Sequence, residues 1–184
     1  MNERFLRDAD KLASLFTALV ERVLVQEVLG NLEDQDLTPA QLTSLYFLAR
    51  HESNVVGDLA VGLGVSAPAA TKASDRLVAK GLVSRREGER DRRHSKLEVT
   101  PEGNALLEEV LHARRDRLSG LLQRMSQDDR RSLVKGLRAF LTAAFMTDKE
   151  LIGACCEHCG SDCFSDCVIN QAHLAFLGSE IHGV

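Results

Sequence analysis

Five cysteines lie together near the end of the 184-residue chain, between Cys155 and Cys167. Read from Cys156 the spacing is C-x2-C-x3-C-x3-C, and read from Cys155 it is C-x3-C-x3-C-x3-C. Either frame supplies four thiolates within one short segment. A zinc ribbon would need two CxxC pairs with a long separation between them, and that separation is absent. The spacing therefore favours one compact iron–sulfur cluster wrapped by a single loop, as in ferredoxin-type sites.

We expect the ligands to be Cys156, Cys159, Cys163 and Cys167, because CxxC is the commoner start of a cluster loop, with Cys155 as an alternative ligand. Four local cysteines suit a [4Fe–4S] cluster. The spacing differs from the usual ferredoxin run, so [2Fe–2S], zinc and a thiol/disulfide switch stay open. A metal is favoured over free thiols, since closely spaced thiols oxidise readily in the absence of a metal.

The N-terminal residues mix charges of both signs and lack an apolar core, so they do not form a signal peptide. The longest uncharged runs, 59–71 and 167–179, are shorter than the roughly 20 apolar residues that a membrane-spanning helix needs. We expect a cytoplasmic protein with no membrane partner. In that reducing compartment clustered cysteines bind metals or do redox chemistry more often than they form structural disulfides.

Apolar residues at spacings of three and four predict one amphipathic helix over residues 2–30, ended by Gly30 and Asn31. Thr38 and Gln41 form a predicted capping box, and Gly81 occupies the position after a helix end that favours glycine. Cap residues delimit the other helices: 39–50 after Thr38, 55–63 after Asn54, 67–80 after Ser66, 101–125 after Thr100 and 127–145 after Ser126.

Two strand-like segments, 82–86 and 95–99, flank the charged loop 87–94 and predict a β-hairpin. Two helices joined by a short glycine-containing turn and followed by a hairpin are the order of a winged helix-turn-helix. The predicted fold is mainly α with a small β-wing. We divide it into an N-terminal dimerisation helix (1–37), a DNA-binding domain (38–100), dimerisation helices (101–150) and a cysteine-rich segment (151–184).

The net charge of −4 hides a basic region. Between Ser66 and Leu97 nine Lys and Arg residues outnumber four acidic ones, giving +5, so the remaining residues sum to −9. A local basic patch on an acidic chain is typical of a nucleic-acid site. The face of helix 67–80 predicted to point outward is small or basic, as a surface that enters the major groove requires; it comprises Ser66, Pro68, Ala69, Thr71, Lys72 and Arg76.

Four segments resemble the MarR family of winged-helix transcription regulators: 58–66, 75–83, the Asp-Arg-Arg at 91–93 and 97–103. The resemblance covers roughly residues 5–147. It implies a homodimer that binds double-stranded DNA at a palindromic operator through helix 67–80 in the major groove. Ser66, Pro68, Ala69, Thr71 and Lys72 match its base-contacting positions, Arg90 and Arg92 match the wing tip, and Asp91 and Arg93 match its Asp-x-Arg, in which the acid orients the arginine. It also allows a small-molecule effector between the lobes.

The sequence departs from the family pattern in two places. Helix 67–80 is rich in alanine, so specificity would depend partly on DNA shape or on contacts with thymine methyl groups. A typical family chain would end near the close of helix 127–145, so the cysteine segment is an addition. The apolar stretch 168–177 after it is expected to cover a cluster or to dock on the dimerisation helices.

The resulting hypothesis is a dimeric regulator, expected to be a repressor, whose cluster senses redox state, oxygen, nitric oxide or iron. One alternative is the same regulator with structural or sensory zinc or with a thiol switch. Another is an electron-transfer or enzyme subunit in which the winged helix is a docking module. The +5 segment and the lack of a nucleophile elbow, phosphate loop or HExxH motif count against an enzyme.

Overall fold

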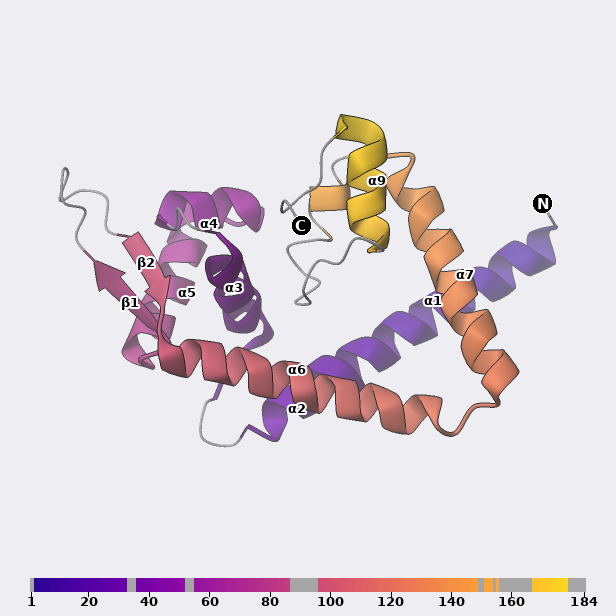
Figure 1. Cartoon of the computed structure of the whole chain (residues 1–184), viewed down its shortest axis with the longest axis horizontal. Coiled ribbons are helices and arrows are strands. Elements are labelled where there is room, and N and C mark those ends of the chain that lie inside the picture. Colours follow the sequence, from indigo (N-terminus) through magenta and orange to yellow (C-terminus); the bar gives the residue numbers. More distant parts are fainter. Residues whose placement is uncertain are drawn as a thin grey trace.

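The structure is a computed structural model that describes residues 2–32, 36–51, 55–86, 96–148, 151–153, 155 and 167–178. A winged-helix lobe and a helical lobe are joined by one long helix, α6 (Figure 1). The predicted fold, mainly α with a small wing, is confirmed. The elements are α1 Glu3–Val20, η1 Glu21–Gln26, α2 Glu27–Gly30, α3 Pro39–Arg50, α4 Val56–Gly62, α5 Ala67–Ala79, β1 Val83–Arg86, β2 Lys96–Val99, α6 Pro101–Leu122, α7 Gln127–Phe145 and α9 Val168–Leu177.

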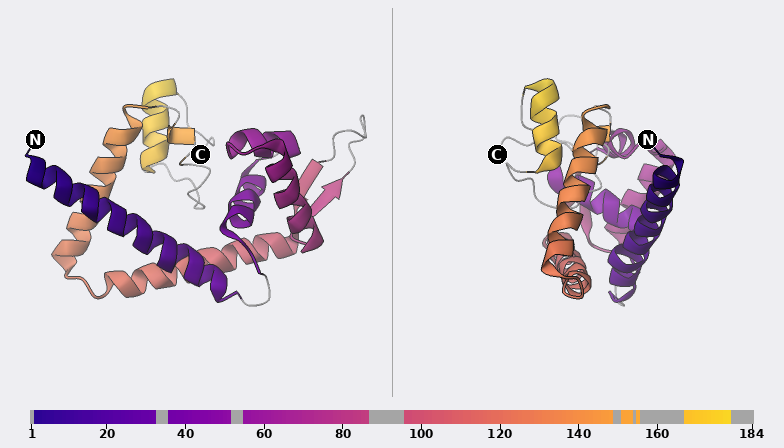
Figure 2. Two further views of the ribbon diagram at one scale, coloured as in Figure 1. Left: turned by 180° about the vertical axis from the view of Figure 1, so that it is seen from behind. Right: turned by 90° about the vertical axis from the view of Figure 1, so that its right-hand side faces the viewer.

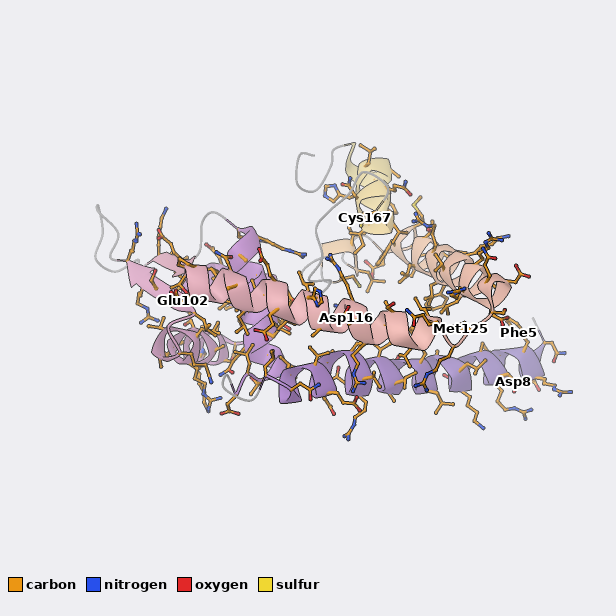
Figure 3. The ribbon with its side chains drawn as sticks, turned by 60° about the horizontal axis from the view of Figure 1, so that its bottom comes forward. Phe5, Asp8, Glu102, Asp116, Met125 and Cys167 are labelled. Atoms are coloured by element: carbon orange, nitrogen blue, oxygen red, sulfur yellow. The ribbon has the colours of Figure 1, made fainter. Side chains whose placement is uncertain are left out.

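The predicted helix over residues 2–30 is confirmed as one continuous rod made of α1, η1 and α2. Its middle part, η1, has π-helical hydrogen bonding, which the sequence did not predict. The C-terminal part of this helix, η1 and α2, packs beside α6, whereas α1 diverges from α6 toward the N-terminus (Figures 1 and 2). Figure 3 labels Phe5 and Asp8 in the first turns of α1 and Met125 after the end of α6. Leu24 and Val28 are buried near α6, and Arg117 of α6 pairs with Glu27 at 2.6 Å. By contrast, α1 contains no buried residue.

The predicted caps are mostly confirmed. Thr38 and Gln41 exchange hydrogen bonds, with the Thr38 N–H donating to the Gln41 side chain at 3.0 Å and the Gln41 N–H donating to Thr38 Oγ1 at 3.3 Å. Ser66, Thr100 and Ser126 each cap the helix that follows. At α4 the cap position is Val55, whose N–H donates to Asp58 Oδ2 at 3.4 Å. The predicted cap, Asn54, lies outside the described residues.

The main core fills the winged-helix lobe and reaches α2 and α6. Helix α3 lies at its centre, and Leu45, Leu59 and Leu77 from three successive helices are fully buried. The ring of Phe47 leaves no room for a Cβ at Gly62, so α4 packs directly on α3 at that point. The two strands pair antiparallel from Val83 opposite Val99 to Arg86 opposite Lys96.

Helix α6 begins against the turn that links α5 to β1. The Thr100 hydroxyl donates to the Gly81 carbonyl at 2.7 Å and accepts from the Gly103 N–H at 3.1 Å. The Thr100 N–H donates to the Leu82 carbonyl at 3.1 Å. A Cβ at Gly103 would collide with that same carbonyl oxygen and with Val99. We call these four residues, Gly81, Leu82, Thr100 and Gly103, the α5–α6 junction.

A second, smaller core lies beyond α7. Phe145 at the end of α7 is buried with Ile152 and with Ile169 and Ala172 of α9, and Cys167 and Val168 pack against them. Figure 2 shows α9 beside the C-terminal end of α7 in both views. The prediction that stretch 168–177 forms a helix docked on a predicted dimerisation helix is therefore confirmed.

No helix among the described residues is long and apolar enough to cross a bilayer.

The collision at Gly103 leads to a stability prediction. Gly103→Ala should lower the free energy of unfolding by about 1–3 kcal/mol, because the added methyl has to displace backbone. Gly120→Ala is the matched control in the same helix, where a Cβ meets nothing within 4 Å. It should stabilise by up to about 1 kcal/mol through helix propensity. Urea unfolding of both variants measures the difference, and equal stabilities would contradict the close approach at the junction.

Candidate nucleic-acid interface

The outer face of α5 includes the residues that the sequence predicted, together with Asp75. All six candidates on or next to this helix are exposed: Ser66, Pro68, Ala69, Thr71, Lys72 and Arg76. The opposite face holds the helix on the core through Ala70, Ser74 and Leu77, which are buried. Helical periodicity alone separates the two faces, and this explains why the sequence predicted the exposed set.

The hydroxyl groups on this outer face form hydrogen bonds with the backbone of their own helix. The Ser66 Oγ accepts the Ala69 N–H at 3.4 Å and so caps the helix. The Thr71 hydroxyl donates to the Ala67 carbonyl at 2.8 Å, and Pro68, Ala69 and Thr71 are all exposed. Small apolar groups of this kind can contact thymine methyls in a major groove.

A shallow hollow of about 640 Å³ follows the same face. Its lining includes both basic side chains of the helix, Lys72 and Arg76, and also the acidic Asp75. An unpaired carboxylate here would repel phosphate. Asp75 is paired, however, because Arg85 of β1 donates to its Oδ1 at 2.8 Å.

The Asp75–Arg85 pair has a structural role that the sequence analysis missed, since it used Arg85 only in the charge count. Both side chains are partly exposed, so the pair adds less than about 1 kcal/mol to stability. The pair instead positions the wing, because it joins strand β1 to α5. The sequence signal for this pair was Asp75, an acidic residue on a face that otherwise lacks acidic residues, followed by Arg85 on the next predicted strand. A second pair, Arg86 with Glu98 at 2.9 Å, links the two strands.

The remaining predicted contacts of the wing, Arg90, Arg92 and Arg93, lie outside the described residues together with Asp91. They stay predictions. Of the two strands that flank them, β1 packs on α5 and pairs with β2, and β2 packs on α3.

Of the predicted metal ligands, Cys156, Cys159 and Cys163 also lie outside the described residues. Cys167 is half-buried at the N-cap of α9, against the small core, and Cys155 is exposed. Partial burial raises the pKa of the Cys155 thiol, which favours its neutral form. Within the described ranges no three His, Cys, Asp or Glu side chains gather as a metal site, and these ranges include only two of the five cysteines.

Comparison with known proteins gives a consistent result for the winged-helix lobe. Residues 35–94 match a family model described as MarR family. The HTH-type transcriptional repressor MdtR of Bacillus subtilis (strain 168) is 34% identical over 128 residues, covering 67% of this chain and 82% of MdtR.

Two solved structures have the same fold. A MarR family protein from Bacillus stearothermophilus aligns with a TM-score of 0.66 and 26% identity over 80% of this chain and 99% of that one. The YusO protein from Bacillus subtilis aligns with a TM-score of 0.63 and 30% identity over 78% and 99%. These matches leave the role of the cysteine segment untested.

The outer face of α5 and the wing should affect DNA binding differently. Arg92→Ala should weaken binding to all DNA sequences alike, because backbone contacts carry no sequence information. Lys72→Ala should weaken binding and also change base preference. Each loss should lower the slope of log affinity against log salt by about one per phosphate contact removed.

Fluorescence anisotropy with operator and random duplexes over a salt series measures these effects. Lys135→Ala is the control, since Lys135 is an exposed lysine of α7, in the other lobe (Figure 1). If neither Arg92→Ala nor Lys72→Ala changes the affinity for DNA, the assignment of the DNA interface to α5 and the wing is wrong.

Proposed function

The chain belongs to the MarR family of winged-helix transcription regulators, and from that premise we propose that it acts in the cytoplasm as a dimeric, sequence-specific repressor controlled by an iron–sulfur cluster. The observation that carries the DNA-binding part is the outer face of α5. It presents small and basic groups, and its one acid, Asp75, is already paired with Arg85. Two copies of this face would reach successive turns of the major groove at a separation of about 34 Å, so we propose a palindromic operator with half-sites one DNA turn apart.

The exposed apolar side chains support the dimer. Large apolar side chains are exposed on helices of the helical lobe, including Phe5, Leu12, Phe16, Val134 and Phe140. Exposed apolar surface of this kind marks a site of association with another protein surface. A second copy of the chain would bury it.

The apolar residues of α1 follow the pattern of a helix packed against another helix. Their spacing alternates between four and three residues, as along a coiled-coil seam, and the seam comprises Phe5, Ala9, Leu12, Phe16 and Leu19. Every residue of this seam is exposed in the single chain. A partner helix from a second copy would cover it.

A charge placed in the seam should disrupt the dimer. Leu12→Asp is expected to raise the dissociation constant of the dimer by at least about a hundredfold, because a carboxylate would be buried without a partner. Ser14→Asp is the matched control, since it adds the same charge two residues away on the outer side of the helix. Light scattering coupled to size-exclusion chromatography measures both, and a dimer insensitive to Leu12→Asp would place the interface elsewhere.

The cluster is proposed from the cysteine spacing and from what anchors the segment. Its first cysteine follows the helical residues 151–153, and its last caps α9. Ile152 and α9 both pack on Phe145 of α7, so both ends of the segment attach to a predicted dimerisation helix. Cluster assembly or loss would thereby alter the helices that set the spacing of the two α5 faces, shifting the dimer between DNA-binding and non-binding forms.

A small-molecule effector is a further proposed input. A hollow of about 400 Å³ lies between the end of the N-terminal helix and the start of α3, lined by residues that include Gln26, Leu29, Asp36 and Thr38. Its position at the connection between the two lobes would let a bound molecule affect their relative orientation.

The cluster is tested by anaerobic purification followed by visible absorption spectroscopy and iron and sulfide analysis. Broad visible absorption with about four irons per chain is expected for [4Fe–4S]. Cys159→Ser should abolish it, because Cys159 belongs to both spacing frames. If the frame beginning at Cys156 is the ligand set, Cys156→Ser should also abolish the visible absorption. Cys155→Ser is the matched control and should retain that absorption.

DNA affinity of the loaded and cluster-free proteins then separates sensing from structure. We expect them to differ at least tenfold for the wild type and not at all for Cys159→Ser. Equal affinities in the wild type would make the cluster structural. A colourless protein that contains zinc would support the zinc alternative. A metal-free protein with a reversible disulfide would support the thiol switch.

A further inference from the structure

Lys80 links the end of α5 to a loop that is distant in sequence. Its Nζ donates to the backbone carbonyl of Asp36 at 3.1 Å, across 44 residues. Lys80 is the C-cap residue of α5, and its own N–H donates to the Arg76 carbonyl at 3.1 Å. Asp36 belongs to the connection between α2 and α3. A side chain at the end of the candidate DNA-binding helix thus contacts the segment that leads in from the N-terminal helix.

The loop around Asp36 provides a fixed acceptor for this contact. The backbone at Asp36 has φ 39°, in the left-handed region that non-glycine residues seldom adopt and that surrounding contacts must stabilise. The next residue, Leu37, is buried in the main core. Thr38 then begins α3 through the capping box that it forms with Gln41. The Asp36 carbonyl precedes a buried side chain and a capped helix start, so a bond to it restrains the end of α5.

Lys80 does not share the outer face of α5. It follows Lys72 by eight residues, which places it about 80° further around the helix axis. The hollow along the outer face is lined by Lys72, Asp75 and Arg76 and does not include Lys80. The amine of Lys80 is also engaged with a carbonyl of its own lobe. Position and bonding therefore separate Lys80 from the basic side chains that would meet phosphate.

The Lys80 bond lies beside the α5–α6 junction and attaches the same helix end to a different element. At the junction, the Thr100 hydroxyl donates to the Gly81 carbonyl at the start of α6. At the adjacent residue, Lys80 bonds to the connection that leads into α3. One attachment leaves a helix end able to swing about that point, whereas a second attachment to another element restricts the swing. The two bonds together favour one orientation of α5 in its lobe.

We propose that Lys80 is a positioning residue for DNA recognition, and that its bond to the Asp36 carbonyl sets the orientation in which α5 enters the major groove. The inference rests on the DNA binding of the proposed function and adds a residue that itself touches no DNA. Base-edge contacts require the helix in one orientation, whereas non-specific binding is electrostatic and independent of sequence. Loss of the bond should therefore reduce discrimination between sequences more than it reduces binding itself.

Lys80→Met tests the proposal, because methionine keeps an unbranched side chain and removes the amine. Fluorescence anisotropy over a salt series compares a palindromic duplex that the wild type selects from a randomised library with a random duplex of equal length. The ratio of the two affinities should fall at least about threefold, while the slope of log affinity against log salt stays the same. Lys80→Arg, which again carries donors for the carbonyl, should restore most of the ratio.

Lys72→Met is the matched variant, since it removes the same charge from the outer face of the same helix. It should lower the salt slope by about one. If Lys80→Met lowers the slope in the same way, Lys80 contacts phosphate and the inference is wrong. An affinity ratio that Lys80→Met leaves unchanged also overturns the inference, and the proposed function then stands. A wild type that binds both duplexes equally overturns the proposed function and the inference with it.

Hydrogen exchange gives a result that does not depend on DNA. Lys80→Met should speed the exchange of amides 77–82, at the end of α5 and in the following turn, because the restraint on this end is lost. Exchange in α7, in the other lobe, is the internal reference and should not change. Lys72→Met should leave amides 77–82 as they are in the wild type. Equal exchange of these amides in the wild type and Lys80→Met would contradict a restraining role for the bond.

Discussion

The α5–α6 junction is the constraint on which the rest of the structure depends. One hydroxyl, that of Thr100, links the Gly81 carbonyl to the Gly103 N–H, and the missing side chain of Gly103 lets α6 press against the backbone of Leu82. Because α5 ends at this turn, these contacts join the end of α5 directly to the start of α6. The junction thereby fixes the position of α5 relative to the helix that leads into the other lobe.

The chain separates its surfaces by chemistry. The outer face of α5 is small and basic, α1 and α7 present apolar faces, and the residues after 150 contain four acids with no Lys or Arg. A net charge of −4 averages over regions of opposite sign, and position rather than total indicates which partner each region suits. The pairing of Asp75 with Arg85 acts on a smaller scale, because it neutralises the one acidic side chain of α5 and joins β1 to that helix.

Local rules made most of the fold predictable. The capping box at Thr38, the cap at Ser66 and the positive φ of Gly81 (72°) depend on residues within four positions of each other, and so does the division of α5 into two faces. Two features that were missed join residues on different elements. Arg85 finds Asp75 only once β1 has packed on α5, and the crowding at Gly103 exists only once α6 meets Leu82. The cysteines lie between these cases. Their spacing is a local property that predicts a cluster, whereas the choice between the two ligand frames depends on how the segment folds.

The π-helical stretch η1 divides the N-terminal helix into two parts with different attachments. Leu24 within the stretch and Val28 and Leu29 on its C-terminal side are buried in their own chain, whereas on its N-terminal side the seam of α1 is exposed. The stretch thus sets the rotation about the helix axis between the exposed seam of α1 and the buried face of α2. Deleting one residue within it would turn the outward seam by about 100° relative to the inward face while keeping every buried residue of α2 in place. Deletion of a single codon would thus reorient α1 without any change in the core packing of α2.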